Sequence, residues 1–251
     1  CSRDWSSDVC SSDLVSPMCQ YSSADGFATD WHLVHLGSRA VGGASLIILE
    51  ATGVSPEARI SPQDLGIWKE EHVEKLKQIT GFLKEQGTVA GIQLAHAGRK
   101  ASTKAPWLGR DKVSPEEGGW QTFAPSAVAY SPGYPHPAEL DEKGIQKVIS
   151  DFSSAAERAL RAGFEVIEIH ASHGYLIHQF LSPLTNLRTD AWGGSFDNRA
   201  RLLLEVIDAV KKVLPGQLPL FVRIPGSDWA DGGWNPDDAV ALAKLLKEKE
   251  V

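Results

Sequence analysis

The stretch from Ile145 to His170, IQKVISDFSSAAERALRAGFEVIEIH, decides the fold. Its first part spaces apolar residues three and four positions apart, which gives an amphipathic helix one buried face. Gly163 then stands where helices commonly end with glycine. The apolar run 166–169 follows, and a short apolar run beside glycine is typical of a buried parallel strand. The stretch therefore predicts a helix, a tight turn and a strand in succession.

The same unit recurs along the chain. Other apolar runs that predict strands cover 15–20, 46–49, 89–94 and 220–224. Other helical patterns cover 30–41, 73–83, 202–210 and 239–246. The run 15–20 is the weakest, because it contains Pro17, which a strand tolerates only near its end. Strands that alternate with helices predict the α/β class, with a parallel sheet and right-handed crossovers.

The number of units indicates how much of a barrel is present. Five βα units are found, whereas a complete (β/α)8 TIM barrel uses eight in roughly 250 residues. Part of the length goes into a proline-rich loop at 100–140, and loops this long are usually functional. The last helix runs up to Val251, where another strand is expected. We therefore expect residues 15–251 to be a partial TIM barrel that is truncated at its C-terminus.

Composition excludes several classes of protein. The 251 residues contain 25 Lys and Arg against 32 Asp and Glu, a net charge of −7, which argues against a nucleic-acid surface. No apolar run approaches the roughly 18 residues of a membrane helix. The chain lacks G-x-G-x-x-G and P-loop motifs, so neither a Rossmann nor a P-loop nucleotide site is supported. The three cysteines form no C-x-x-C pair, and we expect a reducing, cytoplasmic setting.

The first residues, 1–14, differ from the rest. They read CSRDWSSDVCSSDL and repeat Ser-Ser-Asp at 6–8 and 11–13. They have neither the basic nor the apolar region of a signal peptide. We expect this segment to be non-native sequence, similar to a translated sequencing adapter.

Chemically capable side chains follow the predicted strands. Ligands of parallel α/β folds bind beyond the carboxyl ends of the strands, so these positions are candidate site residues. In chain order they are Cys19, Gln20 and Tyr21, then Glu50, Ala51 and Thr52, then Gln93 and His96, then His170, His173 and Tyr175, and finally Arg223.

The two histidines after the fourth strand allow three interpretations. They could bind a metal together with Glu50 or His96, since a metal site needs further ligands from neighbouring strand ends. They could be structural histidines that cap a helix. They could instead donate two hydrogen bonds to one carbonyl or phenolate oxygen and so stabilise enolate charge, with Tyr175 as the proton donor.

The other candidates are weaker when each is taken alone. Arg223 could meet an anion or a polar ring edge, or form a salt bridge to a helix carboxylate. Gln93 could pair with the edge of a heterocycle, although most glutamines do not. Cys19 by itself reads as a small buried apolar residue.

Several motifs together resemble the Old Yellow Enzyme family, closest to its bacterial NADPH dehydrogenase branch with a cysteine beside the flavin. They occur in the family's order from about residue 15 to 251. The motifs are Ser16–Tyr21, Leu65–Trp68, Gly91–Lys100, Ile167–His178, Phe180–Pro183, and Gly193–Ser195 with Asn198 and Arg199.

This resemblance implies a fold, a cofactor and an activity. The family is an FMN-containing (β/α)8 barrel in which NADPH reduces the flavin, and the flavin then delivers hydride to an activated alkene. The resemblance implies small enone or enal substrates and a homo-oligomer. The acidic charge and the lack of a long apolar run argue against nucleic-acid and membrane partners. The alternative from the residues alone is a metal-dependent TIM-barrel hydrolase or lyase that uses His170, His173 and Glu50.

The resemblance also implies residue roles. His170 and His173 would hold the substrate carbonyl oxygen, Tyr175 would protonate the α-carbon, and Tyr21 would contact the substrate. Gln93 would pair with the pyrimidine edge of the flavin, and Arg223 would lie near its N1 and O2 atoms. Cys19 would tune the flavin potential. The remaining flavin-lining residues would be Ser16, Pro17, Met18 and Ala51.

Overall fold

The computed structural model describes residues 13–109 and 111–251. Within them, the main sheet has five parallel strands in the order β1-β2-β3-β6-β7. These strands are β1 (Leu14–Val15), β2 (Leu46–Gly53), β3 (Val89–Ala95), β6 (Val166–His170) and β7 (Leu220–Arg223). The long loop adds a small parallel pair, β4 (Phe123–Ala124) and β5 (Ala138–Glu139).

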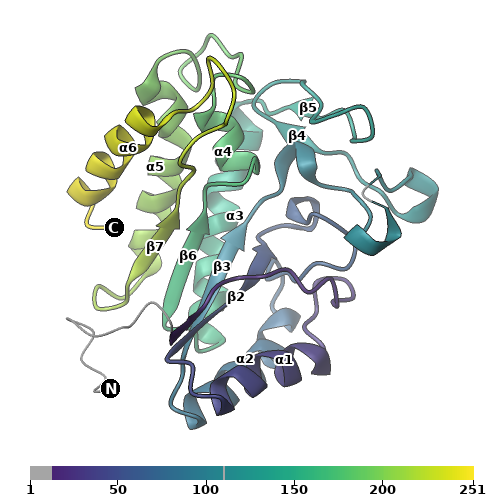
Figure 1. The fold of residues 1–251 in the computed structure, drawn as a ribbon, viewed down its shortest axis with the longest axis vertical. Coiled ribbons are helices and arrows are strands. Elements are labelled where there is room, and N and C mark those ends of the chain that lie inside the picture. The colour runs from purple at the N-terminus through teal and green to yellow at the C-terminus, as the bar shows by residue number, and fades with distance from the viewer. Residues whose placement is uncertain (1–12, 110) are drawn as a thin grey trace.

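The helices alternate with the main strands. They are α1 (Asp30–Val41), α2 (Glu71–Glu85), α3 (Glu142–Arg161), α4 (Leu176–Leu181), α5 (Phe196–Val213) and α6 (Pro236–Glu248). Short 3-10 turns occur at Pro56–Ala58, Gly98–Lys100, Pro106–Leu108 and Pro115–Glu117. Figure 1 shows α3 and α5 behind β3, β6 and β7, with α1 and α2 beside the N-terminal strands. None of the helices in the described ranges is long and apolar enough to cross a membrane.

Local signals fix the helix ends. Asp141 accepts a hydrogen bond from the backbone N–H of Gly144 at the start of α3, and Asn235 caps α6 with Pro236 in its first turn. The chain leaves α2 and α3 through Gly87 (φ 81°) and Gly163 (φ 88°), in the left-handed conformation that glycine adopts without steric cost. The predicted helices and their glycine ends are therefore confirmed.

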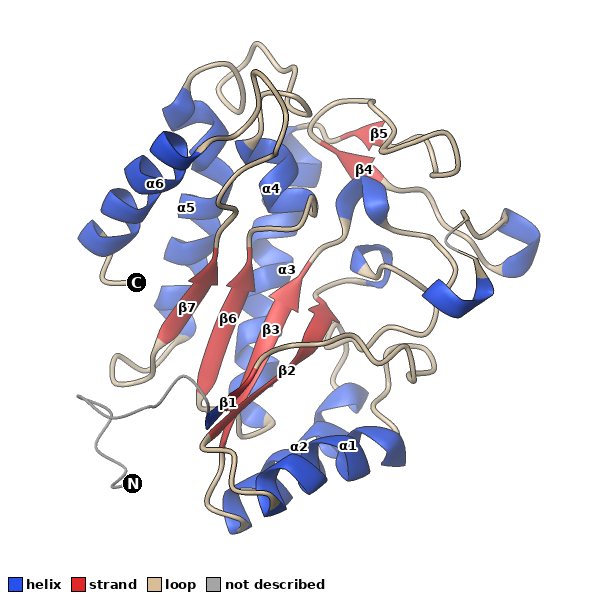
Figure 2. Ribbon diagram, viewed as in Figure 1, coloured by secondary structure: helices blue, strands red, loops and turns tan. Residues whose placement is uncertain are grey.

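The two faces of the sheet pack differently. The face toward the helices carries the main apolar core, in which Ile92, Ile167 and Ile169 are fully buried. The opposite face has a small apolar layer that includes Leu46, Ile48 and Val166. Side chains alternate between the two faces along a strand. Farther along the strands, the second face therefore carries Gln93 of β3, His170 of β6 and Arg223 of β7. The fold thus gathers polar residues at the carboxyl ends of β3, β6 and β7, which are the arrow tips in Figure 2.

One expected boundary was wrong, and one helix was missed. The first strand is β1, which ends at Val15 rather than 20, because Pro17 lacks the N–H that would continue the ladder. Helix α4 was not expected, since its six residues are too short for a clear apolar period. Of the segment 1–14, residues 1–12 lie outside the described residues, whereas Leu14 pairs with Leu46 of β2.

Candidate functional site

The sheet register brings the strand-end residues together. His170 is paired with Arg223 across β6 and β7, and Gln93 is paired with Glu168 across β3 and β6. A bulge at Glu50 shifts the register of β2, so that Ala51 lies next to Gln93. A bulge re-aims the residues that follow it. These residues therefore form two neighbouring rows at the carboxyl edge: Ala51, Gln93 and Glu168 in one, and His170 with Arg223 two residues farther along β6.

The two histidines form a direct contact. Nδ1 of His173 lies 3.3 Å from Nε2 of His170, and the rings meet at 84°. His170 is 3% exposed, whereas His173 is exposed. Tyr175 packs edge-on against His170, with 5.0 Å between the ring centroids. The three residues expected to hold the substrate oxygen and to supply a proton therefore lie in one cluster.

The protonation of this cluster follows from its surroundings. Burial, together with His173 and Arg223, lowers the pKa of His170 to about 3, and burial followed by Arg223 and Lys100 lowers the pKa of His173. The Ser172 N–H donates to Nδ1 of His170 (3.3 Å), which leaves the ring proton on Nε2, facing His173. Both rings are thus neutral donors near pH 7.

Tyr175 keeps its proton over the same range. Burial, followed by the charges of Cys19 and Tyr21, raises the pKa of Tyr175 far above its ordinary value. A phenol that stays protonated at neutral pH can act as a proton donor. The electrostatic effect of Cys19 and Tyr21 also shows that these two expected site residues lie near the cluster, and Tyr21 meets the Trp107 ring edge-on at 5.6 Å.

Arg223 is not tied to a helix carboxylate. Within residues 13–109 and 111–251, its guanidinium makes neither a hydrogen bond nor an ion pair. It lines a cleft instead, and its charge reaches the half-buried Glu168. A half-buried guanidinium without an anion is costly, so this position favours an anionic or polar partner from outside the described chain.

Gln93 is buried and already engaged. Its side-chain Nε2 donates to Oε1 of Glu168 at 2.5 Å. Burial raises the pKa of Glu168, and the Gln93 hydrogen bond and the Arg223 charge oppose that rise. The side-chain oxygen of Gln93 is left to accept from another donor.

The segment after β1 lies along the same edge. Ser16 and Met18 line a small cavity together with Glu50, Met18 is 51% exposed, and Pro17 between them is half-buried. Cys19 is a free cysteine near Ala51, and burial followed by the charges of Asp64 and Glu50 raises its thiol pKa well above the ordinary value. Cys19 is therefore a protonated thiol rather than a thiolate.

The geometry does not favour the metal interpretation. Oε1 of Glu50 lies 2.9 Å from Nε2 of His32, and Oε2 accepts from the backbone N–H of Gln20. The carboxylate is thus used away from His170 and His173. His96 binds the Gly98 N–H through Nδ1 at 3.0 Å. Among the described residues, no group of three or more His, Cys, Asp or Glu side chains is placed to hold a metal ion.

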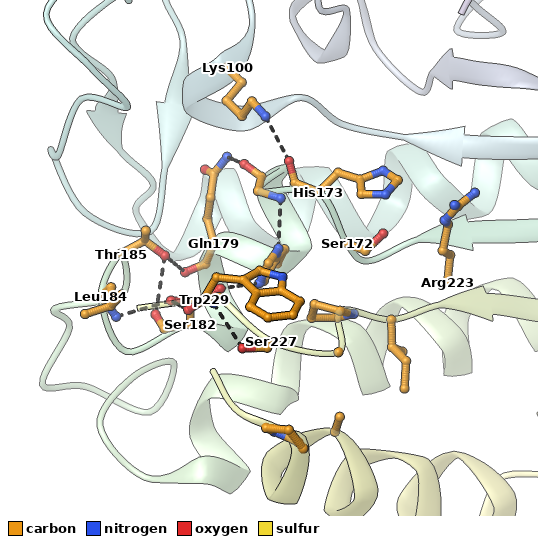
Figure 3. A pocket seen from close by; sticks show the side chains of 18 of the residues that line it. Lys100, Ser172, His173, Gln179, Ser182, Leu184, Thr185, Arg223, Ser227 and Trp229 are labelled. Atoms are coloured by element: carbon orange, nitrogen blue, oxygen red, sulfur yellow. Dashed lines mark hydrogen bonds and ion pairs between the residues drawn. The ribbon is translucent and has the colours of Figure 1, made fainter. Parts of the chain in front are cut away.

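A cleft of about 1030 Å³ opens beside the histidine cluster. His173 and Arg223 line it, whereas Cys19, Ala51 and Gln93 lie outside its lining. Figure 3 shows His173 and Arg223 near one another on one side of the view, with Leu184 and Thr185 on the opposite side. Arg99 and Lys100 add positive charge to the wall, although the chain as a whole is acidic. This charge and these donors suit a ligand with anionic or carbonyl oxygens.

Most of the lining residues had no role in the sequence reasoning, and four of them are charged or polar side chains close to the histidine cluster. Lys100 donates to the backbone oxygen of His173 at 2.9 Å, and its Nζ lies 5.1 Å from the centre of the Tyr175 ring. His178, Gln179 and Asp228 also bound the cleft. Lys100, His178 and Gln179 lie within or beside the quoted motifs, but only their contacts reveal what they do.

A model of the NADH:flavin oxidoreductase / NADH oxidase family matches residues 14–251. The chain belongs to this family. An NADPH dehydrogenase of Bacillus subtilis is 48% identical over 240 residues, which cover 95% of this chain and 66% of that protein. An NADH:flavin oxidoreductase of Gibberella zeae is 46% identical over 252 residues, which cover 95% of this chain and 61% of that protein.

Solved structures of family members have the same fold. The Old Yellow Enzyme homologue from Zymomonas mobilis matches with a TM-score of 0.82 and 30% identity, over 95% of this chain and 66% of that one. Morphinone reductase matches with a TM-score of 0.78 and 31% identity, over 94% of this chain and 63% of that one. The chain thus spans slightly less than two thirds of its relatives, and the expected partial TIM barrel of the Old Yellow Enzyme family is confirmed. FMN, the expected cofactor, is the cofactor of this family.

Proposed function

We propose that this chain carries the substrate-binding half of an FMN-dependent oxidoreductase, which uses NADPH to reduce the C=C bond of α,β-unsaturated carbonyl compounds. The observation that carries the proposal is the pair of neutral imidazoles at His170 and His173, 3.3 Å apart, with Tyr175 packed against His170. Two ring N–H donors beside a protonated phenol suit a substrate oxygen that gains negative charge during reduction.

The residues present fit FMN. Arg223 offers a guanidinium with no hydrogen bond or ion pair inside the described ranges, and Gln93 offers a buried amide oxygen, one strand away on each side of β6. Reduced flavin gathers charge near N1, which a cation stabilises, and its pyrimidine edge pairs with an amide. Ser16, Pro17, Met18, Cys19 and Ala51 are proposed to line the flavin along the same edge. When bound, FMN supplies the hydride that NADPH provides.

The chain's own residues then act on the substrate. His170 and His173 bind the carbonyl oxygen and draw electron density from the alkene, which makes its β-carbon a better hydride acceptor. Tyr175 gives its phenolic proton to the α-carbon and regains a proton from water. Tyr21, whose ring meets Trp107, is proposed to border the substrate.

Flavin titration and an acceptor assay test the proposal. We expect the protein to bind FMN with a shift of the flavin spectrum and, as the full-length enzyme, to oxidise NADPH when 2-cyclohexen-1-one is added. A full-length protein that stays colourless with added FMN contradicts the proposal. Stoichiometric zinc or manganese without flavin would point instead to metal-dependent chemistry.

A further inference from the structure

The turn that carries the proposed oxygen-binding and proton-donating groups is strained. His173 has φ 59° and Gly174 has φ 73°, two left-handed residues in succession. A left-handed non-glycine residue costs on the order of 1 kcal/mol or more and persists only where its surroundings hold it. The contacts around this turn therefore decide where His173 and Tyr175 point.

Side chains from two other segments hold the backbone of this turn. Lys100 donates to the His173 carbonyl oxygen at 2.9 Å, and Gln179 donates to the Gly174 carbonyl oxygen at 2.7 Å. The Gly174 N–H donates to Nδ1 of His178 at 2.8 Å. Figure 3 shows these bonds converging on the turn from Lys100 and from helix α4.

His178 is itself held from the opposite side. Because Nδ1 accepts a backbone N–H, the ring proton sits on Nε2, which lies 2.8 Å from Oδ1 of Asp228. Burial raises the pKa of Asp228, but bonds from His178, Ser182 and the Trp234 N–H outweigh burial and hold it below the ordinary value. Asp228 is thus a fixed anion on the loop after β7.

We propose that His178, oriented by Asp228, is a positioning residue that sets His173 and Tyr175 for the substrate oxygen. It acts through the Gly174 N–H. The loop after β7 thereby controls the geometry of the loop after β6. A histidine oriented by a carboxylate keeps one tautomer, so its acceptor nitrogen always faces the turn. The part of the inference that concerns substrate binding rests on the proposed function. The part that concerns the conformation of the turn rests on the observed hydrogen bonds alone.

The experiment compares His178→Ala, His178→Asn and Thr88→Val in the FMN-loaded full-length protein. Asparagine retains an acceptor oxygen for the Gly174 N–H. Thr88 is a matched control outside the cleft lining: it is buried, and its hydroxyl donates one hydrogen bond, to the Ala44 carbonyl oxygen at 2.7 Å. The probe is phenol, titrated through the visible spectrum of the flavin, with FMN affinity and thermal midpoint measured alongside.

The expected result separates positioning from general stability. His178→Ala weakens phenol binding about tenfold or more, the effect of one lost hydrogen bond, while its FMN affinity stays near the wild-type value. His178→Asn restores most of the phenol affinity, and Thr88→Val keeps it. The proposal is overturned if His178→Ala binds phenol like wild type, or if Thr88→Val weakens binding as much.

Hydrogen exchange keeps the proposal testable if the protein binds neither FMN nor phenol, in which case the proposed function fails. The Gly174 amide is then followed by NMR in the 251-residue chain. Slow exchange in wild type and Thr88→Val, with faster exchange in His178→Ala and recovery in His178→Asn, supports the positioning role. Equal exchange in all four proteins overturns it.

Discussion

Nε2 of His170 and Nδ1 of His173 lie 3.3 Å apart, at the end of a chain of donors that starts at the Ser172 N–H. The Ser172 N–H fixes Nδ1 of His170 as an acceptor, so the proton of His170 lies on Nε2, the nitrogen that faces Nδ1 of His173. Each donor polarises the next. The pair therefore acts as one donor unit whose outer member is exposed and whose inner member is buried.

His170→Ala should weaken the binding of phenol or an enone by about 10- to 100-fold, because it removes a buried donor worth about 1–3 kcal/mol. A spectral titration of the FMN-loaded protein measures the change. His136→Ala, at an exposed histidine outside the cleft lining, is the control. An unchanged affinity in His170→Ala would argue against its proposed role.

Tyr175→Phe should slow alkene reduction by about 10²- to 10⁴-fold, the usual contribution of a positioned proton donor. Ligand affinity should change little, because the aromatic ring still packs against His170. Stopped-flow measurement of flavin reoxidation by 2-cyclohexen-1-one, beside flavin reduction by NADPH, isolates the step. Equal slowing of both half-reactions would contradict a role confined to substrate protonation.

Arg223→Met should lower the flavin reduction potential by about 30–60 mV, which corresponds to about 1.4–2.8 kcal/mol for two electrons. The lost cation no longer stabilises the charge of reduced flavin. Arg223→Lys should retain part of the effect, and Lys212→Met is the control at an exposed cation. Equilibration with a redox dye measures the potential, and a value equal to wild type in Arg223→Met would remove Arg223 from the flavin site.

The acid limb of the stability curve should depend on His170. Its pKa falls from about 6.5 to about 3 on folding, so the unfolded chain binds a proton that the folded chain does not. This contribution to stability is present above pH 6.5 and is lost as pH falls toward 3, by an amount on the order of 5 kcal/mol.

His170→Gln should therefore flatten the dependence of the unfolding free energy on pH between about 6.5 and 3, when urea unfolding is measured at several pH values. The buried His96, whose pKa burial lowers to about 4, keeps part of the slope in the variant. His136→Gln shows what removing a surface imidazole does. An acid limb as steep as in wild type would show that His170 is not buried in its neutral form.

The sequence predicted the regular parts of the fold well, because their signals are local. Helix α1 has the bounds expected from apolar spacing, and the apolar runs 46–49 and 166–169 lie inside β2 and β6. Helix α4 was missed because six helical residues carry too little apolar periodicity. The end of β1 was missed because the length of this two-residue strand depends on its pairing with β2. The prediction that residues 1–14 are non-native remains open.

The sequence by itself determined which chemical groups stand at the strand ends, because a parallel α/β pattern places such groups at one edge wherever the strands pair. It also determined the family, since ordered motifs carry that information. Only the tertiary structure decided which groups meet: that Arg223 adjoins His170, that Glu50 turns to His32, and that His178 holds the turn of His173. Register, burial and the reach of side chains from other loops decide these contacts, and none of them is encoded in local spacing.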